Sequence, residues 1–90
     1  MSTPAPRVVC VVVTRDRPES LAHCLTALAD QARRPDHLVL VDNGPDERTR
    51  ELLDASPIPH TYLPSDTNLG GAGGFAYGIL TARALGADWV

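Results

Sequence analysis

The chain has 90 residues, enough for one small domain at most, and it carries a formal net charge of -3 at neutral pH. Its hydrophobic fraction of 43% and charged fraction of 21% are typical of a globular protein and exclude a disordered chain. The acidic balance argues against a nucleic-acid partner, which would need a basic face. All eight basic residues are arginine, a side chain well suited to bidentate contact with phosphate.

The two cysteines, Cys10 and Cys24, have no zinc-ligand spacing, and both are interpreted as small buried hydrophobic residues in a reducing compartment. The N-terminus lacks a signal-peptide segment, and no stretch is long enough to span a membrane. We therefore expect a cytoplasmic protein with a flexible tail over residues 1–6 and one domain over residues 7–90.

The first half of the chain predicts two buried strands and a helix between them. Val8–Val13 and His37–Val41 are continuous apolar runs, which are typical of strands covered on both faces. Pro18 opens the intervening helix, with Asp16 or Arg17 near its cap, and the helix ends before Pro35. The apolar residues that follow the helical period are Leu21, Cys24, Leu25, Leu28 and Ala32.

The second half predicts a helix over Asp46–Ala55, a short strand over His60–Leu63 and a polar loop that leads into a glycine run. A third helix follows, and Gly86 ends it as a C-cap. Ala87–Val90 resembles the beginning of a fourth strand, within which the sequence stops. The apolar face of the third helix is expected to consist of Phe75, Ala76, Ile79, Leu80 and Ala84.

Alternation of strands and helices predicts an α/β fold with a parallel sheet and right-handed crossovers. In such sheets, ligands bind beyond the carboxyl ends of the strands. The segments that follow the three strands are Thr14–Arg17, Asp42–Asn43 and Asn68 with the glycines. These polar segments should therefore meet at one edge, which is the strongest pointer to a site.

The segment Thr14–Arg17 offers a hydroxyl, free backbone groups and two guanidinium groups, which suit a nucleotide with its diphosphate. A solvated turn that caps the next helix explains the same residues equally well. In the second segment, Asp42 at the end of a buried strand is expected to accept a hydrogen bond from a ligand. Asn43 is expected to serve the turn as an Asx residue.

The glycine run Gly70–Gly74 would let the backbone approach a ligand and direct amide N–H groups toward it. The segment also satisfies the loose dinucleotide pattern G-x-G-x-x-A. We reject the dinucleotide interpretation because the run follows the third strand rather than the first, and no ribose-binding acid comes after it.

Together the three segments resemble family 2 glycosyltransferases, which have the GT-A fold. V-V-V-T-R-D-R-P-E-S-L resembles their opening strand and turn, V-L-V-D-N-G their second-strand motif, and N-L-G-G-A-G-G-F the entry to their third helix. The last motif is most similar to the rhamnosyl- and galactofuranosyl-transferase branch, which builds bacterial cell-wall polysaccharide. The resemblance implies a partial, Rossmann-like GT-A domain of three α/β/α layers, truncated within its fourth strand.

The resemblance also implies a role for each site residue in binding a nucleotide-sugar donor, with a UDP-sugar as the expected donor. Thr14 and Asp42 would hold the nucleoside, with Asp42 accepting from the uracil ring. Arg17 would lie on the diphosphate side, next to Arg15. Asn43 would support the turn, and Asn68 and Gly70 would shape the third wall of the donor pocket.

By the same resemblance, the full enzyme transfers a sugar with inversion to a glycan or lipid-linked acceptor at the inner face of the membrane. It uses a divalent cation, magnesium or manganese, held by a D-x-D motif. This sequence contains neither that motif nor the family's general base, so we expect the chain to be inactive alone. In the family the fourth strand pairs with the first, so an incomplete fourth strand would leave an edge that invites self-association.

The alternative interpretation is a small non-catalytic nucleotide-binding or regulatory α/β module, in which Asp42 would work like the acid of a receiver-type domain. Such a domain needs an acidic pair after the first strand and a late lysine. Here Arg15 and Arg17 flank a single acid, and the chain has no lysine. These residues favour the glycosyltransferase interpretation.

Overall fold

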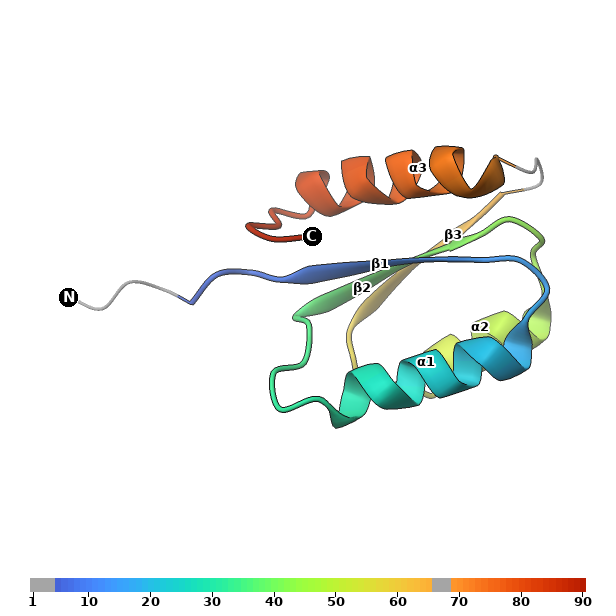
Figure 1. The fold of residues 1–90 in the computed structure, drawn as a ribbon, viewed down its shortest axis with the longest axis horizontal. Coiled ribbons are helices and arrows are strands. Elements are labelled where there is room, and N and C mark those ends of the chain that lie inside the picture. The colour runs from blue at the N-terminus through green and yellow to red at the C-terminus, as the bar shows by residue number, and fades with distance from the viewer. Residues whose placement is uncertain (1–4, 66–68) are drawn as a thin grey trace.

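Strands and helices alternate along the chain in a computed structural model, which describes residues 5–65 and 69–90 (Figure 1). The continuous β-branched run of the first strand and the proline that opens the first helix set the early boundaries. The elements are β1 (Val9–Thr14), α1 (Pro18–Asp30), β2 (His37–Asp42), α2 (Glu47–Asp54), β3 (His60–Pro64) and α3 (Gly70–Ala84).

The strands form a parallel sheet in the order β1-β2-β3. Helices α1 and α2 cover one face, and α3 covers the other, so the sheet is the middle of three layers (Figure 1). This arrangement confirms the predicted α/β fold and its parallel pairing. All three strands point their carboxyl ends toward the same edge of the sheet.

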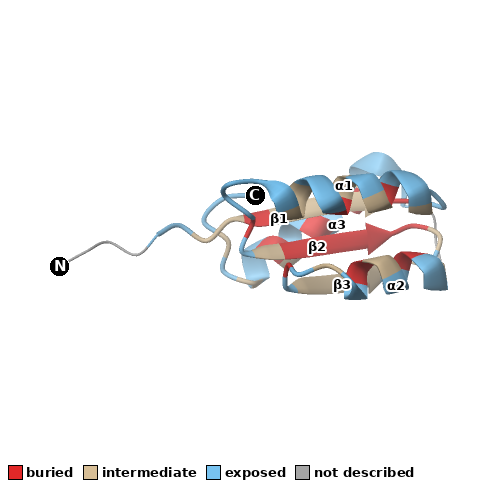
Figure 2. Ribbon diagram, turned by 90° about the horizontal axis from the view of Figure 1, so that it is seen from below, coloured by how far each residue is buried: buried red, intermediate tan, exposed pale blue. Residues whose placement is uncertain are grey.

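Side chains on β2 alternate between two apolar clusters, one on each face of the sheet. Leu38 and Leu40 pack with residues of α1 and α2, whereas Val39 packs with Ala82 of α3. Every residue from Leu38 to Asp42 is fully buried, and Figure 2 shows β2 as the buried centre of the molecule. The same alternation decides which face receives each polar side chain at the end of the strand.

Helix α1 is shorter than the sequence predicts. It ends at Asp30, and Ala32 lies beyond it and is exposed, so its predicted place on the apolar face is wrong. Leu21 and Leu25 form the buried face as expected. Helix α2 begins after Asp46, whose carboxylate accepts from the Arg48 backbone N–H at 2.9 Å as an N-cap.

Helix α3 differs most from the prediction. It begins at Gly70, so the glycine run is helical rather than part of a loop. Its buried residues are Gly74, Gly78 and Ala82, and the expected apolar face is wrong. The residues predicted to face inward are exposed: Phe75, Ala76, Ile79, Leu80 and Ala84.

These apolar side chains cannot face the sheet because α3 lies very close to it. A Cβ atom on Gly74 would lie 2.8 Å from Val13 Cγ1, and one on Gly78 would overlap Val11. The helix therefore reaches the strands through a stripe that has no room for larger side chains. Apolar periodicity cannot reveal this stripe because glycine carries no hydrophobic signal.

The C-terminal end of α3 is closed by the glycine that the sequence predicts. Gly86 has φ of +81° and donates to Arg83 O, and Ala87 N donates to Ala82 O. The chain then returns beside β1, where Val9 N donates to Trp89 O at 2.9 Å. Within the described part of the chain this contact is a single parallel bridge rather than a strand, and self-association along this edge stays a prediction.

Replacement of Gly78 by alanine should destabilise the fold by about 1–3 kcal/mol, because the new methyl group overlaps Val11 and forces α3 away from the sheet. Urea unfolding measures this change. Gly71→Ala is the matched control, since no described atom outside its chain neighbours and its own helix backbone lies within 4 Å of its Cβ position. This change should leave stability equal or raise it by up to about 1 kcal/mol. Equal effects of the two changes would contradict the tight contact.

The environment of His37 predicts that the fold loses stability in acid. Its ring contacts Thr61 Oγ1 at 2.7 Å, and its pKa is lowered from 6.5, first by burial and then by the charges of Arg7 and His60. His37 therefore binds a proton more readily in the unfolded chain than in the folded one. The contribution of neutral His37 to the free energy of unfolding is fully present above pH 6.5 and decreases below it. The urea concentration at the unfolding midpoint should therefore decrease as the pH is lowered from about 7.5 to about 5.

His37→Gln should reduce this fall in the urea midpoint. His23→Gln is the control, because His23 is exposed on α1, and it should change the acid dependence less. Identical profiles for His37→Gln and the unsubstituted chain would refute the assignment.

Candidate functional site

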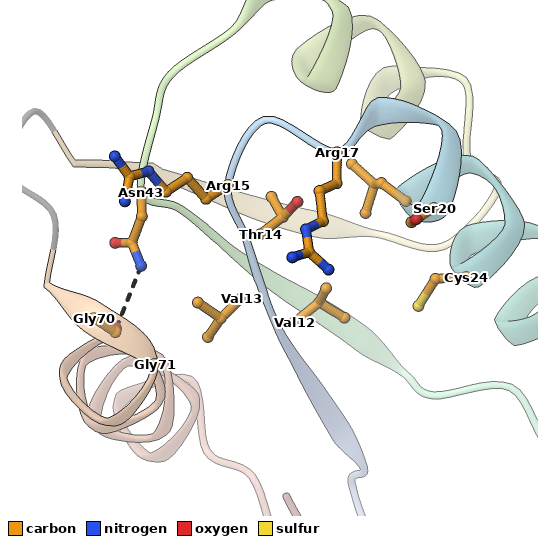
Figure 3. A pocket seen from close by; sticks show the side chains of 11 residues that line it. Val12, Val13, Thr14, Arg15, Arg17, Ser20, Cys24, Asn43, Gly70 and Gly71 are labelled. Carbon is orange, nitrogen blue, oxygen red and sulfur yellow. Dashed lines mark hydrogen bonds between the residues drawn. The ribbon is translucent and has the colours of Figure 1, made fainter.

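The candidate site lies where β1 and β2 end together. Their register places Thr14 directly opposite Asp42, and Asn43 N donates to Thr14 O at 2.9 Å. The segments that follow these strands therefore leave the sheet side by side. Gly70 approaches the same point from α3, where its carbonyl accepts from Asn43 Nδ2 at 3.4 Å (Figure 3).

A cavity of about 560 Å³ surrounds the end of β1. Val12 and Val13, which point to opposite faces of the strand, both contribute to its wall, so the cavity extends around the strand (Figure 3). Five of the seven predicted site residues line it: Thr14, Arg15, Arg17, Asn43 and Gly70. The sixth, Asp42, is fully buried and does not line the cavity, and the seventh, Asn68, lies outside the described residues.

Among the described residues, the cavity wall carries two arginines and no acidic side chain. Arg15 and Arg17 lie on either side of the end of β1 (Figure 3), and neither forms an ion pair within residues 5–65 and 69–90. Asp16 lies between them with φ of +46°, a conformation that aspartate tolerates better than most residues. Its carboxylate turns away to meet Arg48 at 3.4 Å. The wall is therefore suited to an anion.

Asn43 contributes an unpaired hydrogen-bond acceptor. Its residue is only 7% exposed, its amide nitrogen donates to Gly70, and its amide oxygen has no partner among the described residues. Buried polar atoms are usually paired. This oxygen has less than 1 Å² of exposed surface, so a donating group of a ligand reaches it only if the side chain turns toward the cavity. Asn43 directly follows β2, and the alternation of side chains along that strand directs it to the α3 face, where Gly70 lies.

Asp42 takes the structural task that the sequence suggested for Asn43. Its side chain is fully buried, and its two carboxylate oxygens accept from Gly44 N and Asp46 N, each at 3.3 Å. The Tyr62 hydroxyl donates to the same carboxylate at 2.7 Å. The Asx contacts of the turn are thus made by Asp42, whereas Asn43 lines the cavity.

Tyr62 is held firmly in its hydrogen-bonded, protonated form. Burial, followed by the hydrogen bond to Asp42 and the charge of that carboxylate, raises the pKa of Tyr62 to about 12. The Arg50 guanidinium lies 5.8 Å from the centre of the tyrosine ring, within cation–π range. The turn after β2 is therefore tied to both β3 and α2.

Several residues that line the cavity were not among the predicted site residues, and Ser20, Leu21 and Cys24 are examples. Ser20 and Cys24 are spaced by four residues on α1, so helical periodicity places them on one face beside Arg17. That spacing could have revealed them. Cys24 is half-buried, as is Cys10, whose pKa is raised by burial and by the nearby Cys24.

The described residues contain no cluster of three or more histidine, cysteine, aspartate or glutamate side chains that could hold a metal ion. Of the described acids near the site, Asp42 accepts from backbone N–H groups and Asp46 pairs with Arg48. No helix in the described ranges is long and apolar enough to cross a membrane.

Comparison with known proteins agrees with this architecture. Residues 9–86 match the sequence profile of glycosyl transferase family 2. The chain is 60% identical over 84 residues to galactofuranosyltransferase GlfT1 of Mycolicibacterium smegmatis, and 56% identical over 85 residues to galactofuranosyltransferase GlfT1 of Mycobacterium tuberculosis. Each match covers 92% of this chain and 28% of the relative.

No solved structure matches the chain. The family profile, in contrast, covers β1 through the end of α3, including every element that builds the cavity. The chain therefore belongs to glycosyl transferase family 2.

Proposed function

We propose that the cavity binds the nucleotide of a nucleotide-sugar donor, with uridine diphosphate as the expected nucleotide. The observation that carries this proposal is the cavity wall, which borders about 560 Å³ of space. Among the described residues, its two arginines have no ion-pair partner and the buried Asn43 amide oxygen has no hydrogen-bond partner. A diphosphate would satisfy the arginines, and a nucleobase or ribose donor would satisfy the asparagine. Both chemistries belong to one nucleotide.

Asn43 is our candidate for the contact with the uracil ring. The family resemblance suggests Asp42, but that carboxylate is fully buried and accepts three hydrogen bonds within the chain. Because Asn43 Nδ2 is directed to Gly70 O, its oxygen is left as the acceptor. An acceptor placed opposite N3 would favour uracil, whose N3 carries a hydrogen, over cytosine, whose N3 carries none.

The reaction that this binding would serve is the transfer of galactofuranose, or of rhamnose, to a cell-wall glycan or lipid-linked acceptor. Its support is the family and the names of the relatives, of which the chain spans 28%. A divalent cation is expected for the family, but the described residues offer no cluster that fits one. The role proposed for this chain is therefore to bind and orient the donor nucleotide.

Uridine diphosphate should perturb the backbone amide signals of Thr14, Asn43 and Gly71 in a nuclear magnetic resonance titration. Arg17→Ala should weaken the binding of uridine diphosphate at least roughly fivefold, because it removes a charge-assisted contact to phosphate. Arg83→Ala is the matched control, since Arg83 lies in the last turn of α3, at the opposite end from the cavity. It should leave affinity unchanged.

Binding of uridine, which has no phosphates, tests the proposed contact with the base separately from the proposed contacts with the diphosphate. Asn43→Ala should weaken both uridine and uridine diphosphate, whereas Arg17→Ala should weaken only the diphosphate. Cytidine diphosphate should bind less tightly than uridine diphosphate to the unsubstituted chain, and Asn43→Ala should reduce that preference. An unsubstituted chain whose signals do not respond to uridine diphosphate would refute the proposal.

A further inference from the structure

The residue that fixes the geometry of the cavity does not line the cavity. Tyr62 lies on β3 and takes no part in the wall, yet its hydroxyl makes the shortest hydrogen bond to the Asp42 carboxylate, at 2.7 Å. The two backbone donors to the same carboxylate are longer, at 3.3 Å each. The tyrosine is therefore the strongest anchor of this buried charge.

The carboxylate in turn holds the turn that leads to α2. It accepts from Gly44 N and Asp46 N, so both ends of the short segment after Asn43 are attached to one group. The Asp46 side chain then caps α2 through Arg48 N. Displacement of the carboxylate would thus move the segment immediately after Asn43.

Two residues of the cavity wall depend on this turn. Asn43 directly precedes Gly44. The Arg15 side chain lies beside Gly44, because a Cβ atom built on this glycine would lie 3.5 Å from Arg15 Cγ. The backbone of Asn43 is held separately by Thr14 O. What the turn controls is therefore the direction of the Asn43 and Arg15 side chains.

We propose that Tyr62 is a positioning residue for nucleotide binding, which acts by anchoring the Asp42 carboxylate so that the following turn directs Asn43 and Arg15 into the cavity wall. This inference rests on the proposed function of the cavity. The inference gives a role in binding to Tyr62 of β3, although the ligand does not need to contact this residue. Arg50, above the tyrosine ring, supports the same anchor from α2.

The test compares Tyr62→Phe with Thr61→Val in the 90-residue chain. Both changes remove a hydroxyl that makes a 2.7 Å contact from β3, but Thr61 meets His37 on the other face of the sheet. Tyr62→Phe should weaken uridine diphosphate roughly fivefold to tenfold, because a buried charge loses its best donor. It should also shift the Asn43 side-chain amide signals in the absence of ligand, and Thr61→Val should do neither.

A double-mutant cycle distinguishes positioning from a general loss of stability. If Tyr62 acts through Asn43, Tyr62→Phe should weaken binding less in an Asn43→Ala chain than in the unsubstituted chain. Thermal melting records the stability of each variant separately. Full additivity, or unchanged affinity and unchanged Asn43 signals in a folded Tyr62→Phe chain, would overturn the inference.

A measurement on the unsubstituted chain covers the case in which Tyr62→Phe does not fold. Coupling between two sites is reciprocal, so uridine diphosphate should slow hydrogen exchange at Gly44 N and Asp46 N, and unchanged exchange would refute the coupling. If the unsubstituted chain binds no uridine diphosphate, the proposed function fails. The ligand-free Asn43 signals would then still decide whether Tyr62 positions this side chain.

Discussion

The site depends on the register between β1 and β2, which brings Thr14 and Asp42 to the edge of the sheet together. A shift of one residue would exchange the faces of every side chain on β2. Asp42 would then leave Tyr62, and Asn43 would leave Gly70. The apolar residues of β2, which are buried on both faces, prevent this shift because either face would lose its packing. Core packing therefore fixes the polar chemistry at the end of the strand.

Helix α3 shows how the same glycine run serves two purposes. Gly74 and Gly78 let the helix lie directly on the valines of β1, and this contact sets how closely its first turn approaches the cavity. Gly70 and Gly71, one turn earlier, form part of the cavity wall. A bulkier residue in the stripe would therefore act at a distance, by moving the wall with the helix. Packing and binding are coupled through one rigid element.

Much of this arrangement could be predicted from the sequence, because strand order, parallel pairing and the convergence of polar segments follow from local patterns. The face of α3 could not be predicted, since the buried stripe is built from glycine and Ala82 rather than from large apolar residues. The division of roles between Asp42 and Asn43 was also inaccessible to motif reasoning. It follows from strand alternation combined with the positions of Tyr62 and Gly70, which only the tertiary structure supplies.

The cavity favours anions although the chain as a whole is acidic, and the placement of the aspartates explains this. Asp36 accepts from Val8 N and pairs with Arg33, and its pKa is lowered chiefly by the backbone hydrogen bond. Asp88 accepts from Arg7 N at the far end of the sheet. Asp36, Asp42, Asp46 and Asp88 thus each accept from a backbone amide, and Asp16 pairs with Arg48. Arg15 and Arg17 remain without partners in the described structure, so local charge, rather than net charge, determines which ligand this edge of the sheet can hold.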